Sequence, residues 1–131
     1  MDVVPTFLDL AGSQQPQGEF NGRKVQPIRG KSWLPYLEGK SERIYTPTDA
    51  VGTELFGSRA LRQGDWKITD IGDGKWQLFH LASDPGEVND LANLHPERLA
   101  ALTAQWNAYA NEVGVIIPQP AFGHYKQLDP K

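Results

Sequence analysis

The fold is decided by Gly57-Ser58-Arg59-Ala60-Leu61-Arg62-Gln63-Gly64-Asp65-Trp66-Lys67, then Trp76-Gln77-Leu78-Phe79-His80-Leu81, then Asp84-Pro85-Gly86-Glu87-Val88-Asn89-Asp90-Leu91. The first piece alternates until a Gly-Asp pair turns the chain into a second alternating segment. A Gly-Asp-Gly turn leads to the third segment, and Asp-Pro-Gly ends it. This order predicts an antiparallel meander with strands near residues 59–63, 66–71 and 76–81.

A long helix is predicted to follow the meander. Pro96 suits a first helical position, and Glu97 complements the positive end of a helix. Apolar residues then recur at spacings of three and four before Gly114, namely Leu99, Leu102, Trp106, Tyr109 and Val113. We expect this stripe to pack on the sheet, and the alternative is a groove for a cofactor or partner.

Shorter elements are predicted before the meander. Asp2 is a suitable N-cap for a helix that Gly12 ends, and Ser32 is a suitable cap for a second helix through Glu38. Residues 13–30 read as a loop with a short strand near residues 24–25. Residues 44–51 are rich in strand formers, but Pro47 either confines such a strand to an edge or ends it early.

Together these elements predict an α+β fold. We expect a sheet of about four antiparallel strands packed against the long C-terminal helix, with short N-terminal helices. Residues 1–117 should form one domain, and the proline-containing residues 118–131 should form an extended tail.

Composition excludes several function classes. The chain has 13 basic and 16 acidic residues, a net charge of −3 and no basic block, so nucleic-acid binding is not expected. No cysteine is present, which rules out disulfides and thiolate metal sites. No apolar run approaches the roughly 20 residues that span a bilayer. No signal peptide is evident at the start, so we expect a soluble, cytoplasmic chain.

The same three pieces also carry a family resemblance. Together with Asp2-Val3-Val4-Pro5-Thr6-Phe7-Leu8-Asp9-Leu10-Ala11-Gly12 and Gly30-Lys31-Ser32-Trp33-Leu34-Pro35, they resemble the C-terminal subdomain of type I sulfatases, the arylsulfatase family. The resemblance implies a relative of the sulfate-ester hydrolases. Members of that family use a formylglycine, made from Cys or Ser in a Cys/Ser-x-Pro/Ala-x-Arg motif, beside a calcium ion held by Asp and Asn side chains.

This sequence lacks the catalytic part of the family pattern. It has no Cys, and no Ser begins the motif, so we assign no catalytic residue, no metal ligand and no cofactor to this chain. Gly74-Lys75-Trp76-Gln77-Leu78 resembles the family's sulfate-binding Gly-Lys-Trp-His-Leu, but Gln77 stands where the family has His. We therefore do not expect Lys75 to bind sulfate.

Other polar residues fit structural roles. His80, His95 and His124 are scattered, with no i, i+4 pair that would bring two rings to one metal. An acidic cluster follows the meander, at Asp84, Glu87 and Asp90. A turn in which Asp90 caps Leu91-Ala92 would explain it without calcium.

One pair has a candidate role near a substrate. Glu54 and Arg59 flank residues 55–58, which we interpret as a loop. In sulfatases the corresponding loop reaches toward the rim of the substrate pocket, so the resemblance implies a substrate-rim role for both residues. The alternative is a plain surface ion pair between them.

The sequence thus predicts an arylsulfatase-like C-terminal fragment that is inactive alone. Its family role would be to support a catalytic sulfatase domain, its expected partner, and to shape the substrate-pocket rim. The alternative is an autonomous binding or self-assembly module that kept the fold without the chemistry. Without the partner domain, apolar residues such as Val4, Phe7, Leu8 and Trp33 should be exposed, which makes a homodimer possible.

Overall fold

The computed structural model describes residues 1–117, and the predicted tail at 118–131 lies outside them. The chain divides into two compact units, one of residues Met1–Thr46 and one that begins at Pro47. We call them the N-terminal unit and the sheet unit. The boundary between them falls inside the single domain that the sequence suggested. No helix among residues 1–117 is long and apolar enough to cross a membrane.

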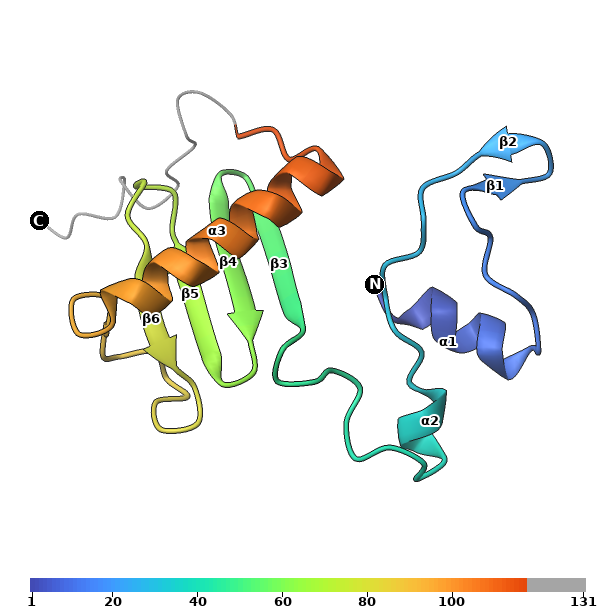
Figure 1. Cartoon of the computed structure of the whole chain (residues 1–131), viewed down its shortest axis with the longest axis horizontal. Coiled ribbons are helices and arrows are strands. Elements are labelled where there is room, and N and C mark those ends of the chain that lie inside the picture. The colour runs from blue at the N-terminus through green and yellow to red at the C-terminus, as the bar shows by residue number, and fades with distance from the viewer. Residues whose placement is uncertain (118–131) are drawn as a thin grey trace, which may run out of the picture. The chain divides into compact units, whose positions relative to one another are not determined.

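The sheet unit contains a four-stranded antiparallel sheet in the order β3-β4-β5-β6 (Figure 1). Its strands are Ala50–Leu55 (β3), Ser58–Gln63 (β4), Trp66–Asp70 (β5) and Gln77–His80 (β6). The predicted meander of β4, β5 and β6 is therefore confirmed. Leu55 pairs with Ser58 and Gln63 pairs with Trp66, so two-residue turns join the first three strands.

The first strand differs from the prediction. Residues 44–49 are not a strand, so β3 shares only residues 50–51 with the predicted strand and ends at Leu55, the first residue of the supposed loop. Proline cannot donate to a strand ladder, and Pro47 accordingly lies before β3 rather than inside it. The expected edge position is confirmed, because β3 is the first strand in the sheet order.

Helix α3, Pro96–Val113, lies across one face of the sheet (Figure 1). Gly114 ends it in the left-handed conformation, with a φ of 71°. The helix buries Leu102 and Trp106 against three strand residues, and these five form the core cluster. Those strand residues are Leu61, Ile68 and Leu78. The predicted packing of the stripe on the sheet is confirmed, except that Val113 at its end is 38% exposed.

Gly52 fixes the close approach of α3 to the edge strand. A Cβ atom at Gly52 would collide with the ring of Tyr109. Since Tyr109 comes from α3 and packs against the core cluster, this contact brings the helix onto β3. Glycine lowers the strand propensity of this segment, but the contact with Tyr109 requires a residue without a side chain at position 52.

The N-terminal unit contains short elements only. They are helix α1 (Val3–Leu10), strands β1 (Glu19–Phe20) and β2 (Arg23–Lys24), and helix α2 (Leu34–Leu37). The two short helices were predicted, although Trp33 rather than Ser32 occupies the N-cap position of α2, and the Ser32 hydroxyl accepts the Leu34 N–H at 3.1 Å. The strands form a hairpin whose Asn21-Gly22 turn has positive φ at both residues. Asn-Gly is a strong hairpin signal, and we had predicted only one short strand there.

Polar contacts hold the N-terminal unit together. Asp2 occupies the N-cap position of α1, but its side chain does not cap the helix as predicted. Its carboxylate instead accepts hydrogen bonds from the Lys31 N–H at 3.1 Å and the Tyr45 hydroxyl at 2.6 Å. Thr6 donates to the Asp2 carbonyl at 2.7 Å and accepts from the Trp33 N–H at 2.9 Å.

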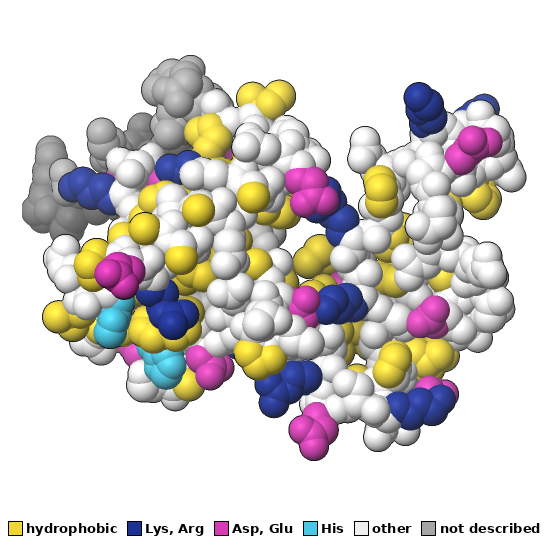
Figure 2. Space-filling model, in the orientation of Figure 1, with side chains coloured by type: hydrophobic (Ala, Val, Ile, Leu, Met, Phe, Trp, Pro, Cys, Tyr) yellow, Lys and Arg dark blue, Asp and Glu magenta, His cyan; other side chains and the backbone are white. Residues whose placement is uncertain are grey.

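This unit leaves most of its large apolar side chains exposed. Helix α1 buries Pro5 and Thr6, whereas four of its apolar residues are more than half exposed: Val3, Val4, Phe7 and Leu10. Phe20, Trp33, Tyr36 and Leu37 are also exposed in the same unit. Hydrophobic side chains are correspondingly visible on its surface (Figure 2). The predicted exposure is confirmed for Val4, Phe7 and Trp33, while Leu8 is half-buried.

Candidate functional site

Arg59, a predicted rim residue, lies in a closed cluster between the sheet and α3. Its guanidinium lies over the rings of Trp76 and Trp106, 4.6 and 4.9 Å from their centroids. The Nη2 atom of Arg59 is 2.8 Å from the Asp70 carboxylate, and Nε donates to the same oxygen at 2.9 Å. This arrangement combines a cation–π contact with a charge-assisted ion pair.

Asp70 is fully satisfied although it is only 1% exposed. Its second oxygen accepts the backbone N–H groups of Gly72 at 2.9 Å and Gly74 at 3.1 Å. The carboxylate thereby fixes the β5–β6 turn as well as Arg59. Removing one partner of a buried pair leaves the other charge without a partner, so we expect the loss of either residue to destabilise this end of the sheet.

Glu54 faces a different partner. It lies opposite Arg59 in the β3–β4 register, but its carboxylate accepts the Gly57 N–H at 2.8 Å. The surface ion pair between Glu54 and Arg59 that we considered is therefore wrong, because Arg59 pairs with Asp70. The supposed loop at 55–58 is likewise corrected, since it is a two-residue turn between paired strands.

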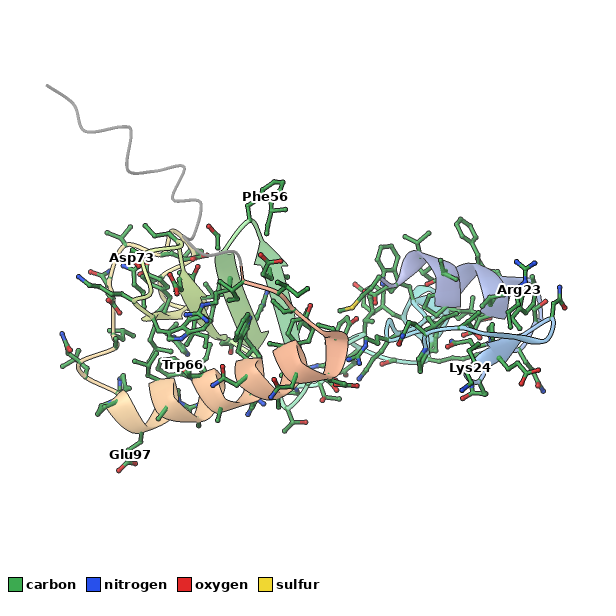
Figure 3. All side chains as sticks on the ribbon, turned by 90° about the horizontal axis from the view of Figure 1, so that it is seen from above. Arg23, Lys24, Phe56, Trp66, Asp73 and Glu97 are labelled. Atoms are coloured by element: carbon green, nitrogen blue, oxygen red, sulfur yellow. The ribbon has the colours of Figure 1, made fainter. Side chains whose placement is uncertain are left out.

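The tip of this hairpin is apolar and strained. Leu55 and Phe56 are 66% and 67% exposed. Phe56 adopts a φ of 51°, a left-handed conformation that is unusual for a bulky residue, and Gly57 follows with a φ of 89°. Phe56 projects on the side of the sheet away from α3 (Figure 3). Glu54 and Arg59 thus brace the base of a hairpin that presents Phe56.

A second cluster surrounds Trp66 of β5. The rings of His80 and His95 contact the Trp66 ring at centroid distances of 4.7 and 5.4 Å, and the Arg98 guanidinium lies 4.7 Å from it. The sequence spacing of the two histidines gave no sign of this convergence. His124 lies outside the described residues.

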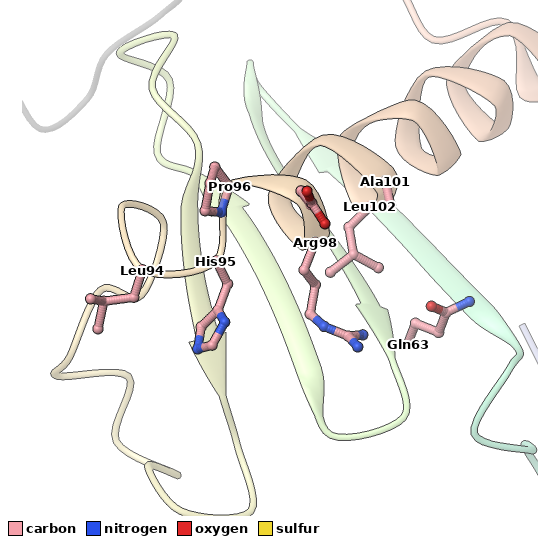
Figure 4. Close-up of a pocket in the computed structure, with 8 residues that line it drawn as sticks. Gln63, Leu94, His95, Pro96, Arg98, Ala101 and Leu102 are labelled. Atoms are coloured by element: carbon pink, nitrogen blue, oxygen red, sulfur yellow. The ribbon is translucent and has the colours of Figure 1, made fainter.

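An open depression adjoins this cluster at the start of α3 (Figure 4). The Arg98 side chain extends over the sheet toward Gln63, at the end of β4. No nucleophile with an adjacent base lines this depression. Within residues 1–117, no three or more His, Asp or Glu side chains are grouped to hold a metal ion.

The acidic cluster forms the predicted turn. Asp84 accepts the backbone N–H groups of Val88 and Asn89, and these bonds lower the pKa of Asp84, the Asn89 bond most strongly. Asp90 accepts the Ala92 N–H at 2.9 Å, as predicted for a cap. Glu87 forms an ion pair with Lys67 at 2.6 Å. Hydrogen bonds and an ion pair therefore account for this cluster.

Comparison with known proteins finds sulfatases. The chain is 40% identical over 121 residues to an uncharacterized sulfatase of Schizosaccharomyces pombe, covering 88% of this chain and 22% of that protein. It is 33% identical over 113 residues to arylsulfatase K of Xenopus laevis, covering 76% of this chain and 19% of the relative. The chain thus spans about a fifth of the length of these relatives.

Solved structures show the same fold. The structure of a 2-O GAG sulfatase matches with a TM-score of 0.60 and 25% identity, covering 84% of this chain and 24% of that one. No family model matches the chain.

Proposed function

Because this chain belongs to the type I sulfatase (arylsulfatase) family as a homologue of its C-terminal subdomain, we propose that it is the supporting part of a sulfate-ester hydrolase. Its partner in this proposal is a catalytic sulfatase domain. The relatives are about five times longer than the matched segment, so they contain ample additional chain to form such a domain.

The observation that carries this proposal is the apolar surface of α1. Val3, Phe7 and Leu10 recur at helical spacing and are each more than half exposed. The unit that contains them buries no large apolar side chain. A contiguous apolar surface on a unit without its own core is typical of an interface, and the catalytic domain is the proposed occupant.

In this proposal the catalytic domain, not this chain, carries out the hydrolysis of the sulfate ester. The sequence has no Cys and no Ser within the formylglycine motif, and its described carboxylates do not form a calcium cage. The residues of this chain therefore do not fit the formylglycine and calcium that the family resemblance implies. We expect the chain alone to be inactive toward sulfate esters.

The β3–β4 hairpin is the proposed contribution to the substrate-pocket rim. Arg59 anchors the base of the hairpin through Asp70, and Glu54 holds the turn through the Gly57 N–H. A rigid base would keep the exposed Phe56 at a fixed position beside a substrate. In this proposal Glu54 and Arg59 are positioning residues of the rim, and Phe56 makes the contact.

Reconstitution tests the proposal. We would express the S. pombe relative without the segment that matches this chain, supply the chain as a separate polypeptide, and assay hydrolysis of 4-nitrophenyl sulfate with calcium. We expect turnover only when both parts are present. No turnover and no co-elution of the two parts would favour the autonomous module instead.

Matched variants locate the contact. Phe7→Glu should abolish co-elution and turnover, because it places a charge in the apolar α1 surface. Gln14→Glu adds the same charge at an exposed loop position of the same unit and should leave both unchanged. Equal loss in both variants would contradict docking through α1.

A further inference from the structure

The two edge strands of the sheet differ in whether other described residues form hydrogen bonds with their outer backbone groups. At the β6 edge, the Leu91 N–H donates to the Leu78 carbonyl at 2.7 Å, and the Asp90 carboxylate accepts the Leu78 N–H at 3.0 Å. The segment after the meander therefore satisfies the outer backbone groups of β6. An edge that is covered in this way cannot accept another strand.

The β3 edge has no such cover. Among residues 1–117, no strand pairs with the outer side of β3, and no hydrogen bond reaches its outer backbone groups. β3 is six residues long and contains neither Lys nor Pro. The carboxylate of its single charged residue, Glu54, accepts a hydrogen bond from the Gly57 N–H. Two of the residue types that usually protect an edge strand, Lys and Pro, are thus missing from β3.

The β3–β4 turn identifies the residues that face outward. In a two-residue hairpin turn the first flanking carbonyl accepts the N–H of the second flanking residue, so Leu55 and Ser58 form a hydrogen-bonded pair. Hydrogen-bonded and non-bonded pairs alternate along an antiparallel ladder. The backbone groups of Leu55, Thr53 and Val51 consequently face β4, while those of Glu54, Gly52 and Ala50 face outward.

We propose that this edge binds the β3 strand of a second copy of the chain, antiparallel across a two-fold axis. The three outward residues then pair as Gly52 with Gly52, Ala50 with Glu54, and Glu54 with Ala50. The two four-stranded sheets become one continuous sheet. This contact needs only the present chain and is independent of any catalytic partner.

The side chains of β3 are complementary to those of a second β3 strand, which favours a second copy of the chain as the partner at this edge. In this register each Glu54 lies opposite an Ala50, so no like charges meet directly. On the face away from α3, Val51 lies opposite Thr53 of the second copy, which pairs two β-branched residues. The two-fold axis passes at Gly52, where the two strands meet with no side chain between them. A two-fold contact of this kind is the commonest form of homo-oligomer.

Sedimentation velocity over a concentration series tests the contact. We expect wild type to shift from monomer to dimer as concentration rises. Val51→Lys with Thr53→Lys places like charges opposite each other twice and should weaken dimerisation about tenfold or more. Val51→Lys with Thr53→Glu should restore the dimer, because each Lys then faces a Glu of the other copy.

A matched control and a second readout keep the test decisive. Gln77→Lys with Asn93→Lys adds the same charge near the covered β6 edge and should leave the dimer unchanged. In wild type, the amide protons of Gly52 and Glu54 should exchange more slowly as concentration rises.

A monomer at every concentration overturns the proposal. A dimer that Phe7→Glu dissociates, with Gly52 and Glu54 amides unprotected, also overturns it, because the contact would then be made by α1.

Discussion

The two units of this chain are stabilised by different means. The sheet unit buries six hydrophobic residues between and around the sheet and α3: Leu61, Ile68, Leu78, Phe79, Leu102 and Trp106. The N-terminal unit buries only Pro5 and Thr6, and its long-range contacts include hydrogen bonds to Asp2 and Thr6. Apolar burial is the dominant favourable term in folding, so the sheet unit should carry nearly all of the stability.

The difference in apolar burial between the two units also bears on how their exposed apolar residues are interpreted. Single exposed residues are ordinary on a protein surface, whereas the α1 residues form a set on one short helix. A core that is missing inside a unit can be supplied by a partner. The comparison therefore predicts that mutations in the two units will have unequal effects on the isolated chain.

The largest expected effect is that of Trp106→Ala. Trp106 is 2% exposed, contacts Arg59 and donates its Nε1–H to the Thr53 carbonyl at 3.3 Å. Truncating a buried Trp costs about 3–5 kcal/mol, out of roughly 5–15 kcal/mol for a whole domain. We expect urea denaturation to show a nearly or fully unfolded chain. Phe7→Ala should leave the midpoint unchanged, and an equal loss in both variants would break the comparison.

Arg59→Met should produce the next largest effect. It leaves the Asp70 carboxylate buried without its ion-pair partner, which we expect to cost about 3 kcal/mol. The double variant Arg59→Met with Asp70→Leu should be less destabilised than the sum of the two single variants. Glu54→Gln, directly opposite Arg59 on β3, should change the urea midpoint little. Additive losses would mean that Arg59 and Asp70 do not act as a pair.

Much of the sheet unit could be predicted because its signals are local. Pro96, Gly114 and the stripe between them defined α3, and the Gly64-Asp65 turn defined the β4–β5 hairpin. The β3 strand could not be placed correctly because its Gly52 is chosen by contact with Tyr109, which is distant in sequence. Local propensity carries no information about such a contact.

The site was predicted less well for the same reason. Glu54 and Arg59 were identified as a pair from their positions in the sequence, but their partners come from a turn and from β5. The Trp rings that cover Arg59 belong to the segment before β6 and to α3. The strained Phe56 could have been noticed, since a Phe-Gly pair between two strand-like segments is a poor match to the usual Asn-Gly turn.

Phe56→Asn should stabilise the chain modestly. Asn tolerates the left-handed conformation better than Phe, and relief of the strain should contribute about 1 kcal/mol. Urea denaturation of the isolated chain would measure it. In the reconstituted enzyme the same variant should lower kcat/KM, because the proposed rim contact is lost. A variant with unchanged stability would show that the turn imposes no strain on Phe56.

The smallest expected effect is a pH dependence confined to the N-terminal unit. Burial acts to raise the pKa of Asp2, but the hydrogen bonds from Tyr45 and Lys31 outweigh it, and the pKa is lowered from its ordinary value of 3.8. A group whose pKa is lower in the folded state contributes stability above the ordinary value and loses it as pH falls through the folded value. The Asp2 contacts should thus persist at neutral pH and be lost below about pH 3.8.

Amide exchange of Lys31 would follow this loss directly, because its N–H donates to Asp2. We expect protection of the Lys31 amide to fall on acidification while that of Ile68, in the sheet core, is retained over the same range. Asp2→Asn should remove the pH dependence of Lys31 protection. Simultaneous loss at Lys31 and Ile68 would instead mean that the two units unfold together, since a common exchange profile reports one cooperative transition.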